Sequence, residues 1–385
     1  MLFRSHLRSA LHNELDRFFR QFPNDQAPTA SAFSQARSKL LPSAFVSLLQ
    51  MIVARYYETT PHVKWYGLRL LAIDGSTLRL DGVSASCRDY FDPEAAIEQR
   101  CGLARVSVCF DVANRLPIDA TIAPYRVRER ALAVGHFDHC NSGDLLLMDR
   151  GYPSFWLFSE LIHRDVQFCI RVSPAKWTSI LGRFMHSDDD DSVVKIVPNS
   201  KMRRECHDRS LPEETIALRA VKVRLNTGEV EVLLTNLFDR AKWPTSGFGE
   251  LYHQRWIAEE GYKLEKSRLE LERWSGKSIR AVEQDFYGRM LLATLSACLA
   301  TVAEPLVAEA TKKCKHRYQV NQTRALGILR NQISALLLLA KLRPRLKRLI
   351  QEMCISPTVV RPGRVFPRPI PEMPRRFHMA YKPIP

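Results

Sequence analysis

Residues 68–77 read LRLLAIDGST and residues 144–152 read DLLLMDRGY, and these two stretches decide the fold. Each contains a continuous apolar run of strand length that leads into an aspartate, Asp74 in the first and Asp149 in the second. Continuous apolar runs are typical of central strands that are buried on both faces of a sheet. We therefore predict that both aspartates lie where a buried strand ends.

The segments around these two runs predict an α/β core with a mixed sheet and flanking helices. Patterning and turn residues indicate four further elements: a β-hairpin over 104–125, a helix over 129–137, a helix over 153–162 and a strand over 166–173. The resulting order β–ββ–α–β–α–β is typical of an α/β domain.

Residues 174–246 break this rhythm. They contain three strand-like runs joined by polar turns, which predict a β-strand insertion. Four consecutive aspartates at 188–191 lie in this insertion and predict a solvated loop, with a weak Mg²⁺ or regulatory site as the alternative. The insertion separates two parts of the predicted core, residues 63–173 and 247–300.

The two ends of the chain predict helical regions outside the core. Residues 1–62 are expected to form a DNA-binding module, with helical packing alone as the alternative. Two of its helices join near Pro42, and Ser31 is the expected cap of the first. Residues 301–385 are expected to form a helical, strongly basic region with an extended tail rich in Pro and Arg, whose role is DNA binding, dimerisation or both.

The charge of the chain indicates a polyanionic partner. The 385 residues suffice for two or three domains with a sizeable core, and the net charge is +16. Residues 311–385 hold 17 Lys and Arg against two Glu, a balance of +15, so nearly the whole surplus lies there. Such a region suits nucleic acid or an anionic membrane surface.

The cysteine pattern favours a reducing compartment. Nine cysteines occur at irregular spacing without a C-x-x-C pair, which argues against a disulfide framework or a zinc ribbon. The N-terminus lacks a secretory segment, and we predict no apolar stretch of the roughly 18 residues that a membrane-spanning helix needs. A soluble, cytoplasmic protein is therefore expected.

A charged helical face is predicted within residues 252–266, which read YHQRWIAEEGYKLEK. Tyr252, Arg255, Glu259 and Lys266 follow one another at spacings of three, four and seven residues. At 3.6 residues per turn all four project within about 60° of one another. One carboxylate flanked by two cations and a phenol suits a metal held beside phosphate oxygens.

Three carboxylates in the order Asp, Asp, Glu suggest a two-metal site for phosphoryl transfer. Asp74 and Asp149 would be held by strands, and Glu259 would reach them from a helix. Carboxylate oxygens suit Mg²⁺, with Mn²⁺ as a substitute, and two ions about 3.5–4 Å apart neutralise phosphate charge. Taken singly, each aspartate is more often a turn former or helix cap and Glu259 a solvated residue, so it is their joint occurrence that favours the metal site.

These motifs together resemble bacterial insertion-sequence transposases of the "insertion sequence four" family. The segment 252–266 matches that family's Y-x2-R-x3-E-x6-K pattern at all four positions. DGST around Asp74 and DRGY around Asp149 resemble its two aspartate motifs, and the insertion lies between the second aspartate and the glutamate, as in the family. The resemblance covers residues 30–300.

The resemblance implies an RNase H-like DDE domain that performs cut-and-paste transposition. By analogy, the three carboxylates bind the catalytic metals, while Tyr252, Arg255 and Lys266 contact phosphates at the transposon end. The implied partners are double-stranded DNA, both as terminal inverted repeats and as target, and a second copy of the chain in a dimer on DNA. Some family members also flip a base onto a tryptophan of the insertion, for which Trp177 and Trp243 are candidates beside a structural role for each.

Two other functions stand as alternatives. A catalytically silent, transposase-derived DNA-binding protein would be favoured by a lost carboxylate, and none is missing from the three motifs. A stand-alone RNase H-like nuclease would cleave without joining ends and would not need the Tyr-Arg-Lys set beside the glutamate.

Overall fold

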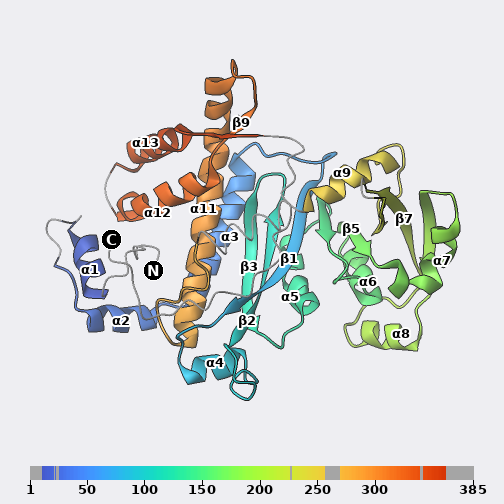
Figure 1. Cartoon of the computed structure of the whole chain (residues 1–385), viewed down its shortest axis with the longest axis horizontal. Coiled ribbons are helices and arrows are strands. Elements are labelled where there is room, and N and C mark those ends of the chain that lie inside the picture. Colours follow the sequence, from blue (N-terminus) through green and yellow to red (C-terminus); the bar gives the residue numbers. More distant parts are fainter. Residues whose placement is uncertain are drawn as a thin grey trace. The chain divides into compact units, whose positions relative to one another are not determined.

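The computed structural model describes residues 11–20, 22, 26–225, 228–255, 269–338 and 341–360. The chain divides into two compact units (Figure 1). One is Pro42–Thr294, and the other combines Met1–Leu41 with Leu295–Pro385. Asp74 and Asp149 both belong to the first unit.

An eight-stranded sheet forms the centre of the unit Pro42–Thr294, in the order β3-β2-β1-β4-β5-β8-β7-β6 (Figure 1). Its strands are β1 (Arg69–Arg79), β2 (Leu103–Asp111), β3 (Leu116–Pro124), β4 (Asp144–Met148), β5 (Gln167–Val172), β6 (Asp191–Ile196), β7 (Ile216–Arg224) and β8 (Val230–Thr235). β4 runs parallel to both β1 and β5, whereas the other neighbouring pairs are antiparallel. The prediction of an α/β fold with a mixed sheet is confirmed.

The helices of this unit precede, separate and follow its strands along the chain, except within the consecutive pairs β2–β3 and β7–β8. They are α3 (Ser43–Thr59), α4 (Ala85–Phe91), α5 (Glu129–His136), α6 (Phe155–His163), α7 (Thr178–His186), α8 (Ser200–His207), α9 (Phe248–His253) and the first part of α11 (Ile279–Thr311). The predicted order β–ββ–α–β–α–β is confirmed, with α4 added between β1 and β2. The predicted start of α6 at Pro153 is two residues early, because Ser154 is extended at φ −157° and ψ 154°.

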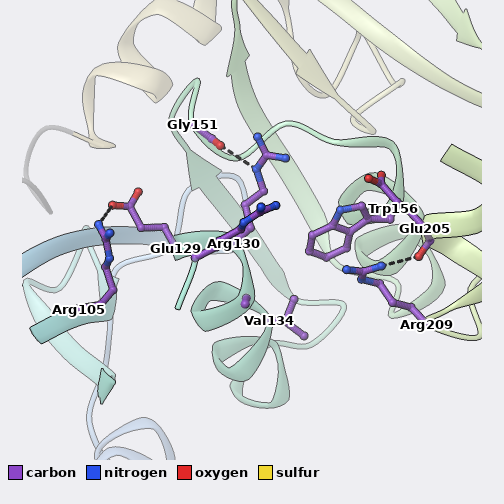
Figure 2. A pocket seen from close by; sticks show the side chains of 10 residues that line it. Arg105, Glu129, Arg130, Val134, Gly151, Trp156, Glu205 and Arg209 are labelled. Atoms are coloured by element: carbon purple, nitrogen blue, oxygen red, sulfur yellow. Dashed lines mark hydrogen bonds and ion pairs between the residues drawn. The ribbon is translucent and has the colours of Figure 1, made fainter. Parts of the chain in front are cut away.

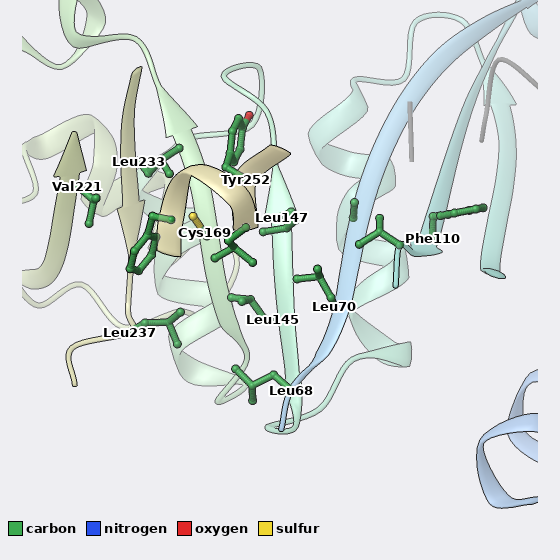
Figure 3. Packing of buried hydrophobic residues seen from close by; sticks show 14 residues of the cluster. Leu68, Leu70, Phe110, Leu145, Leu147, Cys169, Val221, Leu233, Leu237 and Tyr252 are labelled. Atoms are coloured by element: carbon green, nitrogen blue, oxygen red, sulfur yellow. The ribbon is translucent and has the colours of Figure 1, made fainter. Parts of the chain in front are cut away.

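The two apolar runs of the sequence form the core of the sheet. Residues 71–73 and 145–148 are fully buried, so both faces of β1 and β4 are covered. Figure 3 shows one of these faces, where Leu70 of β1 and Leu145 and Leu147 of β4 belong to one packed cluster. Burial of each such leucine stabilises the fold by roughly 1.5–3 kcal/mol. This confirms that both runs are central strands.

The insertion at 174–246 continues this sheet rather than building a separate one. β8 pairs antiparallel with β5, and β7 and β6 follow toward the edge. The three predicted strands are confirmed, whereas helices α7 and α8 were not predicted. The prediction of a solvated loop at 188–191 is wrong for Asp191, which opens β6 and binds the buried Arg219.

The second unit is helical in its described part. Its elements are α1 (Leu11–Phe19), α2 (Ala30–Lys39), the end of α11, β9 (Tyr318–Gln319), α12 (Gln322–Leu338), α13 (Leu342–Cys354) and β10 (Thr358–Val359). The predicted junction near Pro42 is confirmed, since α2 ends at Lys39 and α3 begins at Ser43. The N-cap of α2 is Thr29 and not Ser31, because the Thr29 hydroxyl accepts a hydrogen bond from the amide of Ala32 at 3.1 Å. The predicted tail over 361–385 lies outside the described residues.

Helix α11 corrects one prediction about apolar stretches. By length and composition it is long and apolar enough to cross a membrane, although no stretch of that length was predicted. In the most apolar stretch of 18 residues, 56% of the helix is buried within the protein. The Thr294 hydroxyl also donates to the carbonyl of Pro117 in β3 at 2.9 Å. Both features are those of a helix that packs in a protein core.

Candidate active site

The pairing of β1 with β4 brings the two predicted aspartates together. The strands run parallel, and their ladder ends with Ala72 opposite Leu147. Carried two residues further, the same register sets Asp74 opposite Asp149. Parallel neighbours at one level point to the same face, so this register would direct both carboxylates to one side of the sheet, and the charges of both act on the Tyr152 hydroxyl.

The placement of Asp74 differs in one respect from the prediction. Asp74 does not end its strand, because β1 continues to Arg79 and Asp74 pairs with Val108 of β2. The prediction fails because β1 extends further than its neighbour β4, which ends at Met148. Asp74 therefore lies within β1, beside the end of β4. The edge therefore lies on the β4 side alone.

Asp149 is oriented by one amide and one cation. Its Oδ1 atom accepts a hydrogen bond from the amide of Gly151 at 2.6 Å, and Nη2 of Arg171 in β5 lies 3.6 Å from Oδ2. Arg171 also pairs with Glu231 of β8. The Asp149 side chain is 33% exposed, so oxygen lone pairs stay open to solvent or to a ligand.

The phenol of Tyr152 lies among the charged groups of this site. The residue is 2% exposed, and its hydroxyl has no hydrogen-bond partner among the described residues. Burial raises the pKa of Tyr152, the negative charges of Asp74, Glu129 and Asp149 raise it further, and Arg255 lowers it. The charges of three carboxylates and one guanidinium therefore act on a single buried hydroxyl.

Glu129 is a site residue that the sequence analysis missed. It is the first residue of α5, and a Cβ atom at Gly75 would lie 3.0 Å from its Cγ and 3.4 Å from the Tyr152 hydroxyl. Arg105 of β2 holds its carboxylate at 2.9 Å. The glycine beside Asp74 thus leaves room for Glu129, and a lone glutamate at a helix start gives no sequence signal for this approach.

Tyr252 and Arg255 enter the same neighbourhood from the chain around α9. Tyr252 is 3% exposed, and its hydroxyl donates to the carbonyl of Met148 at 3.4 Å. Two guanidinium groups lie near its ring, with Arg171 at 5.8 Å and Arg255 at 5.7 Å from the ring centre. Burial raises the pKa of Tyr252, whereas Arg255 and Arg171 lower it. Tyr252 is thus placed to position these cations, and its predicted phosphate contact stays a prediction.

Glu259 and Lys266 lie outside the described residues, so the predicted shared face of four side chains stays a prediction. Tyr252 lies in α9, which ends at His253, and Arg255 follows after that end. Within the described part of the chain, no three Asp, Glu, His or Cys side chains are grouped closely enough to hold a metal ion. Asp74 and Asp149 supply the hard oxygen ligands that Mg²⁺ prefers. These donors fit a divalent ion that takes its further ligand from elsewhere in the chain.

The two tryptophans considered for base binding both pack against the fold. Trp177 contacts Phe158 of α6, with ring centres 5.7 Å apart. Trp243 packs against the hydrophobic cluster of Figure 3, and its indole nitrogen is buried. These contacts favour the structural alternative for each residue.

Comparison with known proteins relates this arrangement to transposases. Residues 65–295 match the family described as "Transposase DDE domain". The curated protein "Transposase InsG for insertion sequence element IS4" of Escherichia coli (strain K12) is 28% identical over 301 residues, which cover 74% of this chain. This chain spans 64% of that relative's length.

A solved structure with a similar course of the chain is "Cryo-EM structure of piggyBac transposase synaptic complex with hairpin DNA (SNHP)". The two are 12% identical in sequence with a TM-score of 0.42. The similarity covers 74% of this chain and 57% of the other.

Proposed function

Because this chain belongs to the transposase DDE domain family, we propose that it is a DNA transposase that cuts at the terminal inverted repeats of an insertion sequence and joins the freed 3′-hydroxyl to target DNA. The observation that carries this proposal is the parallel register of β1 and β4, which sets Asp74 opposite Asp149. The buried phenol of Tyr152 lies within reach of the charges of both aspartates and of Arg255, and Arg171 lies 3.6 Å from Asp149.

The proposed architecture is an RNase H-like core over 63–173 and 247–300, interrupted by the insertion at 174–246. Residues 1–62 would form the DNA-binding module and residues 301–385 the basic C-terminal region. The antiparallel group β3-β2-β1 beside the parallel strands β4 and β5 supports such a core. We place the protein in the cytoplasm, acting as a dimer on double-stranded DNA.

In the proposed site, Asp74, Asp149 and Glu259 would hold two Mg²⁺ ions, for which Mn²⁺ would substitute. When bound, such ions neutralise phosphate charge and activate the attacking oxygen. The Gly151 amide and Arg171 keep Asp149 turned toward the site, so the carboxylate need not reorganise when DNA arrives.

The cations of the site would bind the phosphates on either side of the bond that is cut. Arg255 presents a planar guanidinium for two parallel hydrogen bonds, and Lys266 would add a point charge. Both Arg255 and Arg171 lie within 6 Å of the Tyr252 ring centre, which would help to hold the two cations at the site.

The test uses the purified full chain with a labelled DNA fragment that carries the ends of its element, and with supercoiled target DNA. We expect Mg²⁺-dependent cleavage and strand-transfer products that disappear in Asp149→Ala and persist in Asp208→Ala, which changes an exposed aspartate after α8. Cleavage without joining would favour the nuclease. Binding of intact DNA by the unmodified protein, without cleavage, would overturn the transposase proposal in favour of a silent DNA-binding protein.

A further inference from the structure

A pocket of about 660 Å³ opens beside the loop that carries Asp149. It is lined chiefly by charged side chains and one indole, from Arg105, Arg128, Glu129, Arg130, Trp156, Glu205 and Arg209 (Figure 2). The residues come from β2, from the start of α5, from α6, from α8 and from the turn after α8. We call this cavity the arginine pocket.

Three arginines of the pocket form no ion pair with a carboxylate among the described residues: Arg128, Arg130 and Arg209. Arg209 meets the other acidic residue of the lining, Glu205, only through its backbone carbonyl, at 2.6 Å. Other arginines of the same unit, by contrast, form ion pairs with neighbouring acids. In the pocket itself, Arg105 pairs with Glu129. Two of these three arginines are held in place by contacts that leave their positive charge unneutralised. Arg130 donates from Nε to the carbonyl of Gly151 at 2.9 Å, and the guanidinium of Arg209 lies 4.4 Å from the centre of the Trp156 ring (Figure 2).

The start of α5 adds to the positive potential. Arg128 is its N-cap residue and makes no side-chain cap hydrogen bond, while Glu129, Arg130 and Ala131 of the first turn line the pocket. Unpaired amides and the helix dipole at this end favour an anion. Glu129 does not cancel this effect, because it is engaged by Arg105.

The pocket is connected to the candidate active site by two hydrogen bonds. Arg130 binds the Gly151 carbonyl at 2.9 Å, and the Gly151 amide binds the Asp149 carboxylate at 2.6 Å. An anion held by the pocket arginines therefore lies one loop away from the site where a phosphodiester would be cut. Glu129 faces both places, since it lines the pocket and approaches Gly75.

We propose that the arginine pocket binds a backbone phosphate of the DNA strand that is cut, next to the scissile phosphodiester. This inference rests on the proposed function, and it adds a second anchoring point on the side of the sheet where α5 begins. Guanidinium groups suit phosphate because they stay charged and offer parallel donors. Arg130 would couple the anchor to Asp149, so a bound strand also fixes the loop 149–151.

The test compares the double variant Arg128→Gln/Arg209→Gln with Arg204→Gln. Arg204 is an exposed arginine of α8 that does not line the pocket, so it reports the effect of lost charge alone. Arg130 is kept, so the Gly151 contact stays intact. Binding to duplexes of the element's end is measured without divalent metal over a range of salt concentrations, and thermal unfolding verifies the fold.

We expect the double variant to bind roughly tenfold to a hundredfold more weakly, since charge-assisted hydrogen bonds are lost. The slope of log affinity against log salt should fall by about 0.9 for each phosphate contact removed. If the loss of affinity for each removed charge is the same in the double variant and in Arg204→Gln, the inference is overturned. An unchanged salt slope would overturn it as well.

A second measurement locates the phosphate and stands even if the double variant does not fold. In duplexes with one neutral methylphosphonate at a time, the unmodified protein should lose affinity at a position beside the cleavage site. The variant Arg128→Gln changes an exposed side chain. A methylphosphonate at that position should reduce the affinity of this variant less than it reduces the affinity of the unmodified protein. No such position in the scan would overturn the inference, as would competition by inorganic phosphate without any effect of the DNA substitutions.

The two proposals fail in different ways. If the unmodified protein transposes but the pocket variants bind as well as Arg204→Gln, only the pocket inference is lost. If the unmodified protein neither cuts nor joins DNA, the transposase proposal is lost, whatever the binding data show.

Discussion

Two arginine–aspartate pairs on the same sheet differ in how completely their members are satisfied. Arg219 of β7 is 1% exposed, meets Asp191 through Nε and Nη2, and donates from Nη1 to two carbonyls at 2.9 Å. Asp191 also accepts from Thr245 at 2.6 Å. At the candidate site, Arg171 lies 3.6 Å from Asp149, which is 33% exposed and, among the described residues, has the Gly151 amide as its one close donor.

The difference distinguishes a structural pair from a binding pair. A buried ion pair is tolerated only when hydrogen bonds use up its donors and acceptors. The Arg219 pair meets that condition and ties β6 and β7 to the segment before α9. The Asp149 carboxylate of the second pair keeps spare acceptors, which suits a site that binds a cation.

The largest expected effect is on stability at the structural pair. Asp191→Asn would leave the buried Arg219 charge uncompensated, and we expect the free energy of unfolding to fall by about 3–5 kcal/mol. Asp190→Asn is the matched control, because Asp190 pairs with Arg224, which is 63% exposed, and should cost less than about 1 kcal/mol. Urea denaturation measures both, and equal losses would show that the two pairs do not differ.

The same pair should govern part of the acid sensitivity. Burial acts to raise the pKa of Asp191, but hydrogen bonds from Arg219, Thr245 and Arg240 lower it overall. A lowered folded-state pKa gives stability that is present above the unfolded value of about 4 and is lost as pH falls through the folded value. The stability difference between the unmodified protein and Asp191→Asn should therefore shrink below about pH 4. A difference that stays constant in that range would contradict the role of the ionised carboxylate.

A smaller effect on stability is expected at the candidate site. Asp149→Asn removes a partly exposed charge with one weakly held cation, so the free energy of unfolding should change by less than about 1 kcal/mol. Guanidinium or urea melts of this variant provide the measurement. A loss as large as that of Asp191→Asn would mean that Asp149 is a structural residue.

The smallest effect is expected for the buried phenol. Tyr152→Phe removes a hydroxyl without a partner among the described residues, so stability should be unchanged or rise by up to about 1 kcal/mol. Tyr57→Phe is the control, because the Tyr57 hydroxyl donates to Asp111 at 2.7 Å and its loss should destabilise by about 1 kcal/mol. An equal loss of stability in Tyr152→Phe and Tyr57→Phe would indicate that the Tyr152 hydroxyl is hydrogen-bonded in the folded protein.

The contrast between the pairs also explains what the sequence could predict. The buried runs ending near Asp74 and Asp149 are visible as continuous apolar stretches, and they became β1 and β4 at the centre of the sheet. The hairpin 104–125 and the strands of the insertion carry turn residues and alternation, which local sequence reveals.

Other parts depend on contacts between distant segments and left no local trace. Asp191 stands in a run of four acids, and only its pairing with Arg219, 28 residues later, makes it structural. Tyr152 comes near Asp74 because β1 and β4 are parallel neighbours, and Glu129 approaches β1 because Gly75 has no side chain to keep it away. Register and packing of this kind cannot be derived from one chain.

The central claim is that Asp149, unlike Asp191, is kept open in order to bind a divalent ion. Calorimetric titration of Mn²⁺ into the full chain tests it most directly, with Asp149→Asn beside Asp208→Asn as an exposed control. We predict that the unmodified protein and Asp208→Asn bind alike, and that Asp149→Asn binds at least tenfold more weakly while it unfolds at the same urea concentration. Equal Mn²⁺ binding by all three proteins would contradict the account.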